Sequence, residues 1–158
     1  MEIIGYTNYA RTPAKLDAEK FKTLSKELQT VSGLLLKPES SHQMKEVIIL
    51  AGGDGTGRPK FTEDLILFNG DATTGMDHET FAIEREQKNA RIGEKCLVFS
   101  FCKTNRKPFD LMVKISLLRL KHHFPECEIS CDGGKEDWTE SKALYKKAFG
   151  GKTIKINE

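Results

Sequence analysis

The feature that most limits the fold is a change of hydrophobic period near residue 108. Residues 96–102, CLVFSFC, alternate with a period of two, which predicts a β-strand. Residues 108–124, PFDLMVKISLLRLKHHF, carry apolar side chains in two adjoining helical stripes, which predicts a well-buried helix. Residues 127–131, CEISC, predict a further strand. A strand–helix–strand order makes the two strands parallel and places their C-terminal ends at one edge of a sheet.

Shorter patterns predict the other elements. An N-terminal helix within residues 12–32 has Leu16, Phe21, Leu24, Leu28 and Val31 on one face, with Thr12 as its cap and Pro13 in its first turn. Strands are expected at residues 2–7, 46–51, 64–68 and 79–84. A last helix is expected over 135–149, ended by Gly150 and Gly151.

Length and composition favour one domain. A chain of 158 residues with 38% hydrophobic and 30% charged residues can bury a core without crosslinks. We therefore predict a single α+β domain over residues 1–158, with a mixed, mostly antiparallel sheet of about five strands. Two to three helices are expected to pack mainly on one face. Residues 44–102 form a strand meander in this prediction, and residues 103–149 form helix–strand–helix.

Charge and apolar content limit the partners. The net charge of +2 disfavours nucleic acid, because the lysines are mixed with acids and not interleaved with aromatic residues. No apolar run is long enough for a membrane span. The first ten residues lack the pattern of a secretion signal, so a cytoplasmic location is expected. The oligomeric state is left open.

The four cysteines are expected to be free thiols. Cys96, Cys102, Cys127 and Cys131 are spaced C-x5-C and C-x3-C, unlike the close pairs of zinc sites. In a reducing compartment such residues are most often small buried side chains. No metal-binding residue is therefore assigned.

Residues 47–58, VIILAGGDGTGR, contain a glycine-rich stretch. GGDGT resembles the phosphate loop of NAD kinases and diacylglycerol kinases, and the longer string resembles the entry loop of sugar nucleotidyltransferases. A phosphate loop leads into a helix. Here Pro59 and a β-rich run follow, so we interpret the stretch as a turn between strands, with glycines supplying positive φ. Whether residues 52–56 contact a ligand is left open.

Polar residues are expected to gather at one edge of the sheet. If the strands at 64–68, 79–84 and 96–102 form an antiparallel meander, residues 78–79, 102–107 and 130–134 share one edge, which we call the rim. The glycine-rich stretch then lies at the opposite edge. Lys103, Thr104, Arg106 and Lys107 precede a helix and form the candidate anion-binding residues. His78, Glu79 and Asp132 are the candidates for acid–base or metal chemistry.

Each of these residues also has an ordinary structural interpretation. The basic loop can simply be solvated, and His78 can anchor the start of a strand. Asp110 and Asp132 suit helix starts and turns, and His122 and His123 suit the last turn of a helix. Trp138 is expected in the core. Cys102 next to Lys103 would be reactive only with a lowered pKa.

Three segments carry a resemblance to a known family. DHETF, FCKTNRKPFD and ISCDGG resemble the HETF, FCKT-x-x-K-P-[FY]-D and S-x-D-G motifs of a family of small uncharacterised bacterial and phage-borne proteins. The resemblance covers roughly residues 64–140. This chain departs from it at Phe109, where Tyr is expected, and at Cys131, where Ser is expected. The resemblance implies no reaction, but its motifs fall on the same rim.

Two functions are carried forward. The first is binding of a phosphorylated small molecule such as a nucleotide at the rim, with hydrolysis and an accompanying Mg²⁺ as further options. The alternative is a non-catalytic protein-interaction module, an inhibitor or assembly factor of phage type, which has no small-molecule site. The density of polar groups at the rim favours the first.

Overall fold

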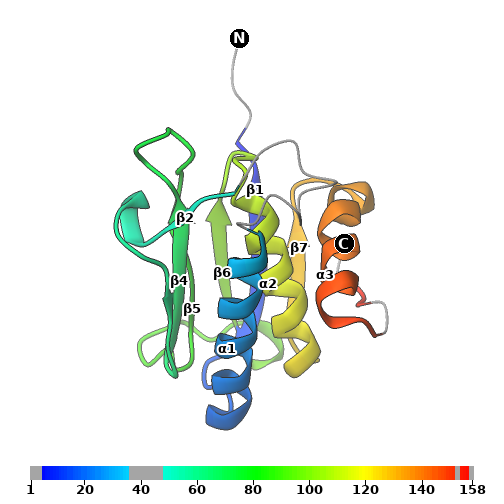
Figure 1. The fold of residues 1–158 in the computed structure, drawn as a ribbon. Helices are drawn as coiled ribbons and strands as arrows, with labels where there is room; N and C mark the ends of the chain where they lie inside the picture. The colour runs from blue at the N-terminus through cyan, green and yellow to red at the C-terminus, as the bar shows by residue number, and fades with distance from the viewer. Residues whose placement is uncertain (1–4, 36–47, 152–153, 157–158) are drawn as a thin grey trace.

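The computed structural model describes residues 5–35, 48–151 and 154–156, which form an α+β fold (Figure 1). The strands are β1 (Thr7–Pro13), β2 (Leu50–Ala51), β3 (Lys60–Phe61), β4 (Leu65–Gly70), β5 (Phe81–Glu84), β6 (Leu97–Lys103) and β7 (Glu128–Cys131). The helices are α1 (Ala18–Leu35), α2 (Asp110–His123) and α3 (Thr139–Phe149). Short 3₁₀ turns precede β3, β6 and α3. The predicted α+β class is confirmed, but two sheets replace the single one expected.

The first sheet has the strand order β6-β1-β7. β1 is antiparallel to both neighbours, with Tyr9 opposite Phe101 on β6 and Ser130 on β7. β6 and β7 therefore run in the same direction, as the strand–helix–strand pattern predicts, with β1 between them. Figure 1 shows α1, α2 and α3 on one face of this sheet. The opposite face carries no helix in the described part of the chain.

The second sheet is built around β4. β2, β3 and β5 each pair with β4, and β3 and β5 lie on opposite edges because both pair with Ile66 and Leu67. The predicted meander is wrong at its last step, because β5 pairs with β4 but not with β6. Two residues before β5, the Glu79 N–H donates to the carbonyl of Lys103 at the end of β6 over 3.1 Å. Near the start of β6, Ile92 forms a β-bridge with Val98 and lies at an edge of β6 in place of β5.

The N-terminal boundaries differ from the prediction. Thr12 and Pro13 end β1 and do not start a helix, and α1 begins at Ala18. Asp17 is the cap, since its carboxylate accepts the Lys20 N–H over 3.0 Å. Because β1 is the central strand, pairing on both edges outweighs its weak strand propensity. Residues 2–4 and 46–47 of the predicted strands lie outside the described residues.

The core lies between the helices and both sheets. The predicted apolar stripe of α1 is buried, from Leu16 to Val31, and so are both stripes of α2 apart from the half-buried Leu111. Trp138 is 1% exposed and belongs to the core, as predicted. The predicted last helix divides into a 3₁₀ turn at Lys135–Trp138 and α3, and it ends at Gly150 with φ 65° as expected. Among the described helices, none has the length and apolar content needed to cross a bilayer.

The three helices are joined by a polar network around Glu27. Its carboxylate accepts hydrogen bonds from the guanidinium of Arg119 and lies 2.5 Å from Nε2 of His123. Arg119 also donates to the Tyr145 hydroxyl on α3 over 3.1 Å. Burial raises the pKa of Glu27, but the hydrogen bonds from Arg119 and His123 outweigh this and hold the pKa below its usual value. His123 thus has a contact beyond its predicted helix-end role.

This network predicts a loss of stability in acid. A carboxyl whose pKa is lower in the folded state stabilises the fold above its unfolded pKa of 4.5, and this contribution disappears as pH falls through the folded pKa. We expect the free energy of unfolding, measured in urea between about pH 6 and pH 3, to fall less steeply in Glu27→Gln than in the unmodified protein. Equal slopes for both proteins would contradict the assignment.

Candidate functional site

The rim brings several predicted residues together. The Lys103 N–H donates to the Glu79 carboxylate over 2.8 Å, so the end of β6 lies against the start of β5. His78 lies next to them and is bonded through its backbone N–H and C=O to the side chain of Asn69. Asp132 follows β7 at the same end of the first sheet. Within the described residues, no hydrogen bond or ion pair joins His78 to Asp132 or Arg106.

Asp132 holds two strand ends together. Its carboxylate accepts the Thr7 N–H over 2.9 Å and the Tyr9 hydroxyl over 2.5 Å. Its own N–H donates to the Thr7 carbonyl. The hydrogen bond to Asp132 raises the pKa of Tyr9. Asp132 therefore fixes the position of Tyr9 on the open face of the sheet.

Two of the predicted anion-binding cations, Arg106 and Lys107, have partners within the chain. The Arg106 guanidinium lies 3.9 Å from the centre of the Tyr6 ring and 3.2 Å from an oxygen of Asp137. Lys107 donates to the Gly75 carbonyl over 3.0 Å. The amides of Lys107, Asp110 and Leu111 donate to carbonyls of the same turn. Arg106, Lys107 and these amides are thus already engaged by groups of the chain itself.

Beneath the rim lies a buried polar cluster of Asn8, Thr104, Asp110 and Lys114. Asp110 accepts hydrogen bonds from the Asn8 amide at 2.7 Å, the Thr104 hydroxyl at 2.6 Å and the Lys114 ammonium at 2.6 Å. Thr104 and Lys114 are 0% and 2% exposed. Asp110 is therefore more than the helix-start acid that its position suggests. The one sequence signal for Lys114 is a lysine within the most apolar helix.

Cys102 is not an activated thiol. It is buried in the core, and burial, followed by the charges of Glu79 and Asp110, raises its pKa to about 12. A nucleophilic cysteine needs the opposite shift. In the described residues no three His, Cys, Asp or Glu side chains are grouped as metal ligands.

The glycine-rich stretch lies beside the β4–β5 hairpin and not at the edge opposite the rim. The Asp54 N–H donates to the Thr80 hydroxyl over 3.0 Å, and the Ala72 N–H donates to the Gly55 carbonyl. Gly55 and Gly57 adopt φ values of 79° and 72°, as predicted for a turn. The strand β3, and not a helix, follows.

The open face of the first sheet carries an aromatic and basic surface that the sequence did not reveal. Phe99 and Phe101 alternate with the inward-facing residues of β6 and are 51% and 60% exposed. On β1, Arg11 lies opposite Phe99, and Tyr9 lies opposite Phe101. Directly opposed residues of an antiparallel pair share a face. The alternation in FSFC signals two faces, but not which one is covered.

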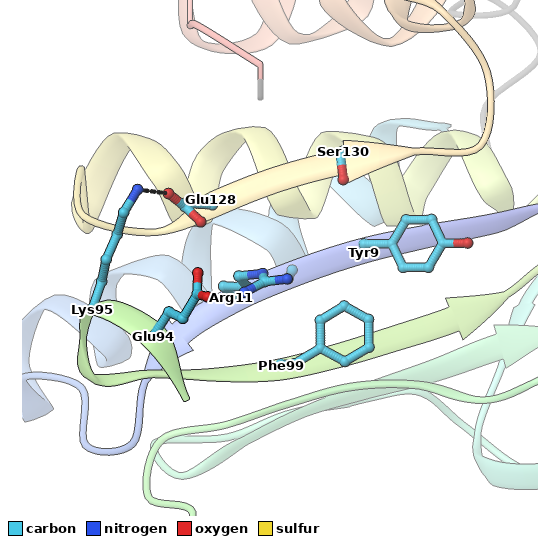
Figure 2. Close-up of a pocket in the computed structure, with 8 residues that line it drawn as sticks. Tyr9, Arg11, Glu94, Lys95, Phe99, Glu128 and Ser130 are labelled. Atoms are coloured by element: carbon cyan, nitrogen blue, oxygen red, sulfur yellow. Dashed lines mark hydrogen bonds and ion pairs between the residues drawn. The ribbon is translucent and has the colours of Figure 1, made fainter. Parts of the chain in front are cut away.

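This surface contains a pocket of about 410 Å³, here called the sheet-face pocket. Its walls come from β1, β6, β7 and the 3₁₀ turn before β6 (Figure 2). The lining residues are Tyr9, Ala10, Arg11, Glu94, Lys95, Phe99, Glu128 and Ser130. The rings of Tyr9 and Phe99 are stacked, with centres 5.9 Å apart and planes inclined by 25°. The Arg11 guanidinium lies 5.4 Å from the centre of the Phe99 ring.

The charged groups of the sheet-face pocket differ in whether they form ion pairs. Lys95 donates to Glu128 over 2.8 Å, and this bond raises the pKa of Lys95 and lowers that of Glu128. Arg11, in contrast, forms no ion pair within 4.0 Å in the part of the chain that the structure describes. An aromatic wall next to a guanidinium that forms no ion pair suits a ligand with a planar ring and a negative group.

A second, smaller pocket of about 220 Å³ lies where β5 and β6 separate. Leu117 and Leu120 of α2 form part of its lining, together with Phe81 and Ile83. Its existence follows from the missing β5–β6 ladder.

Comparisons with protein-family models, with curated proteins and with solved structures found no match to this chain.

Proposed function

We propose that this protein binds a phosphorylated small molecule with a planar ring, such as a nucleotide, in the sheet-face pocket. The observation that carries the proposal is the exposed Tyr9–Phe99 stack with Arg11 against it. Stacking of a base on an aromatic side chain contributes about 1–3 kcal/mol. A pocket of about 410 Å³ is within the usual range for small-molecule sites.

The polar groups of the pocket supply the remaining contacts. Arg11 offers charge-assisted hydrogen bonds to a phosphate, and a guanidinium can bind two phosphate oxygens at once. Ser130 and the Lys95–Glu128 pair offer donors and acceptors to the edge of a base. The proposal therefore assigns the anion site to the sheet-face pocket and not to the rim. Asp132 contributes indirectly, because it accepts a hydrogen bond from the Tyr9 hydroxyl.

Binding is tested by calorimetric titration with the four ribonucleoside monophosphates. We expect Arg11→Gln and Phe99→Ala each to weaken binding about tenfold or more, through loss of a charged hydrogen bond or a stack. Arg58→Gln is the matched control, because Arg58 is an exposed arginine in the glycine-rich segment. Weaker binding in Arg58→Gln but not in Arg11→Gln would place the ligand at that segment and overturn the proposal.

Hydrolysis is a separate hypothesis, with His78, Glu79 and Asp132 as its candidate residues. Two of these carboxylates accept backbone N–H groups at strand ends, which leaves His78 as the side chain to replace first. Release of inorganic phosphate from nucleoside triphosphates, with and without Mg²⁺, tests it. Product release that is unchanged in His78→Ala would exclude His78 as a catalytic residue.

The alternative function is a protein-interaction module. The exposed Phe99 and Phe101 favour it, because large apolar side chains gathered on a sheet face are typical of protein interfaces. This module would have no need of an Arg11 side chain that forms no ion pair with the described residues. Titrations in which no nucleotide binds would favour the interaction module.

A further inference from the structure

The aromatic surface extends beyond the sheet-face pocket. Phe101 does not line the pocket, yet its ring centre is 6.1 Å from that of Phe99, and the two planes are inclined by 33°. It is also the most exposed large hydrophobic side chain among the described residues, at 60%. The sheet therefore presents a second ring-sized platform directly beside the first.

Basic residues lie on both sides of the aromatic rings. Lys103 is two residues beyond Phe101, and so on the same face of β6, opposite Thr7 of β1. Its side chain runs along Gly5, where an added Cβ would lie 3.3 Å from the Lys103 Cε. Like Arg11, the Lys103 ammonium has no ion-pair partner within 4.0 Å among the residues that the structure describes.

Of the acids on this face, Glu94 lines the sheet-face pocket beside Lys95, and two others have hydrogen-bond partners. Asp132 accepts the Tyr9 hydroxyl, and Glu128 accepts the Lys95 ammonium. Arg11, directly opposite Phe99, and Lys103, two residues beyond Phe101, are the cations next to the rings that have no ion-pair partner among the described residues. Each of the two rings thus has a cation beside it. Alternating rings and cations match a polymer of bases joined by phosphates.

We propose that this face binds single-stranded nucleic acid, with one base on Phe99 in the sheet-face pocket and the next on Phe101. The phosphates on either side of these bases contact Arg11 and Lys103. The inference rests on the proposed nucleotide site and adds a second subsite to it. Paired bases cannot lie flat on the rings, so duplexes are excluded from this mode of binding.

The test compares polymers with monomers. Fluorescence anisotropy is measured with labelled oligouridylate and oligothymidylate of about eight nucleotides, within the usual site size, and calorimetry is measured with UMP and dTMP. We expect at least one oligonucleotide to bind about tenfold more tightly than its monomer, since the second stack adds to the first. Tighter binding by either polymer supports the proposal and shows whether RNA or DNA is preferred.

Two variants separate this inference from the proposed function. Phe101→Ala and Lys103→Gln are expected to weaken oligonucleotide binding about five- to tenfold and to leave monomer binding unchanged. Phe99→Ala should weaken both. Two phosphate contacts predict that the logarithm of the binding constant falls with the logarithm of salt concentration with a slope of about −1.4, at about −0.7 per contact.

The outcomes are distinct. Equal affinity for polymer and monomer, or no effect of Phe101→Ala on the oligonucleotide, would overturn the second subsite and leave the nucleotide site standing. Binding of a duplex as tightly as of a single strand would overturn it as well. No binding of either monomer or polymer would remove both proposals. Because Phe101 is mostly exposed, its replacement should leave the melting temperature nearly unchanged.

Discussion

We expect Asp110→Ala to lower the free energy of unfolding by about 3–5 kcal/mol, the range seen when one partner of a buried ion pair is removed. The Lys114 ammonium would stay buried, at 2% exposure, with the Asn8 side chain as its remaining hydrogen-bond partner. The Asn8 amide and the Thr104 hydroxyl would lose their acceptor as well. Urea unfolding at neutral pH measures the loss.

Two further variants test the cause of this effect. Lys114→Met removes the buried ammonium while Asp110 keeps two hydrogen-bond donors, so the loss should be smaller than in Asp110→Ala. Replacing Asp110 with Leu and Lys114 with Met together should restore part of the stability, because an apolar pair carries no desolvation cost. A loss below about 1 kcal/mol in Asp110→Ala would show that Lys114 reaches water.

Phe68→Ala is the second change with a large expected effect, a loss of about 3–5 kcal/mol. Phe68 is fully buried on β4, the strand to which every other strand of the second sheet pairs. Its ring centre lies 5.0 Å from that of Phe81 and 6.2 Å from that of Phe61. A cavity here removes ring contacts that join β3, β4 and β5.

The matched control is Phe99→Ala, the same substitution on the open face. Because Phe99 is 51% exposed and loses one cross-strand stack, the expected loss is about 1 kcal/mol or less. Guanidinium unfolding of both variants gives the comparison. Losses of equal size would mean that the open face is covered in solution, which would favour the interaction module over the nucleotide site.

The periodic patterns predicted the type of most elements. Residues 108–124 are strongly periodic and became α2, and the strands at 64–68, 79–84, 96–102 and 127–131 lie within two residues of their predicted positions. The predicted boundaries of the N-terminal strand and helix were wrong, because YART carries little apolar signal and Thr12-Pro13 is a common helix start. Its strand forms through pairing with β6 and β7, which are distant in the sequence.

The candidate site was only partly predictable. The rim assembles because strand direction alone decides where Lys103 and Asp132 lie, and direction follows from the right-handed crossover. The contact partners of the rim residues could not be predicted from the sequence. Thr7, Tyr6 and Asp137 come from segments that the patterns left unassigned or placed elsewhere. The motif residues Thr104 and Asp110 therefore appeared as candidates for ligand contact or helix capping, although they build a buried polar cluster.

By itself the sequence determined the α+β class, the burial of α1 and α2, and the shared direction of β6 and β7, because these depend on local periodicity and chain handedness. Only the tertiary structure decided that β1 lies between those strands and that one face of the sheet stays open. The reason is that a period of two distinguishes the two faces of a strand without saying which one the helices cover. That choice is made by long-range packing, and it is what places Tyr9, Arg11, Phe99 and Phe101 together on the open face.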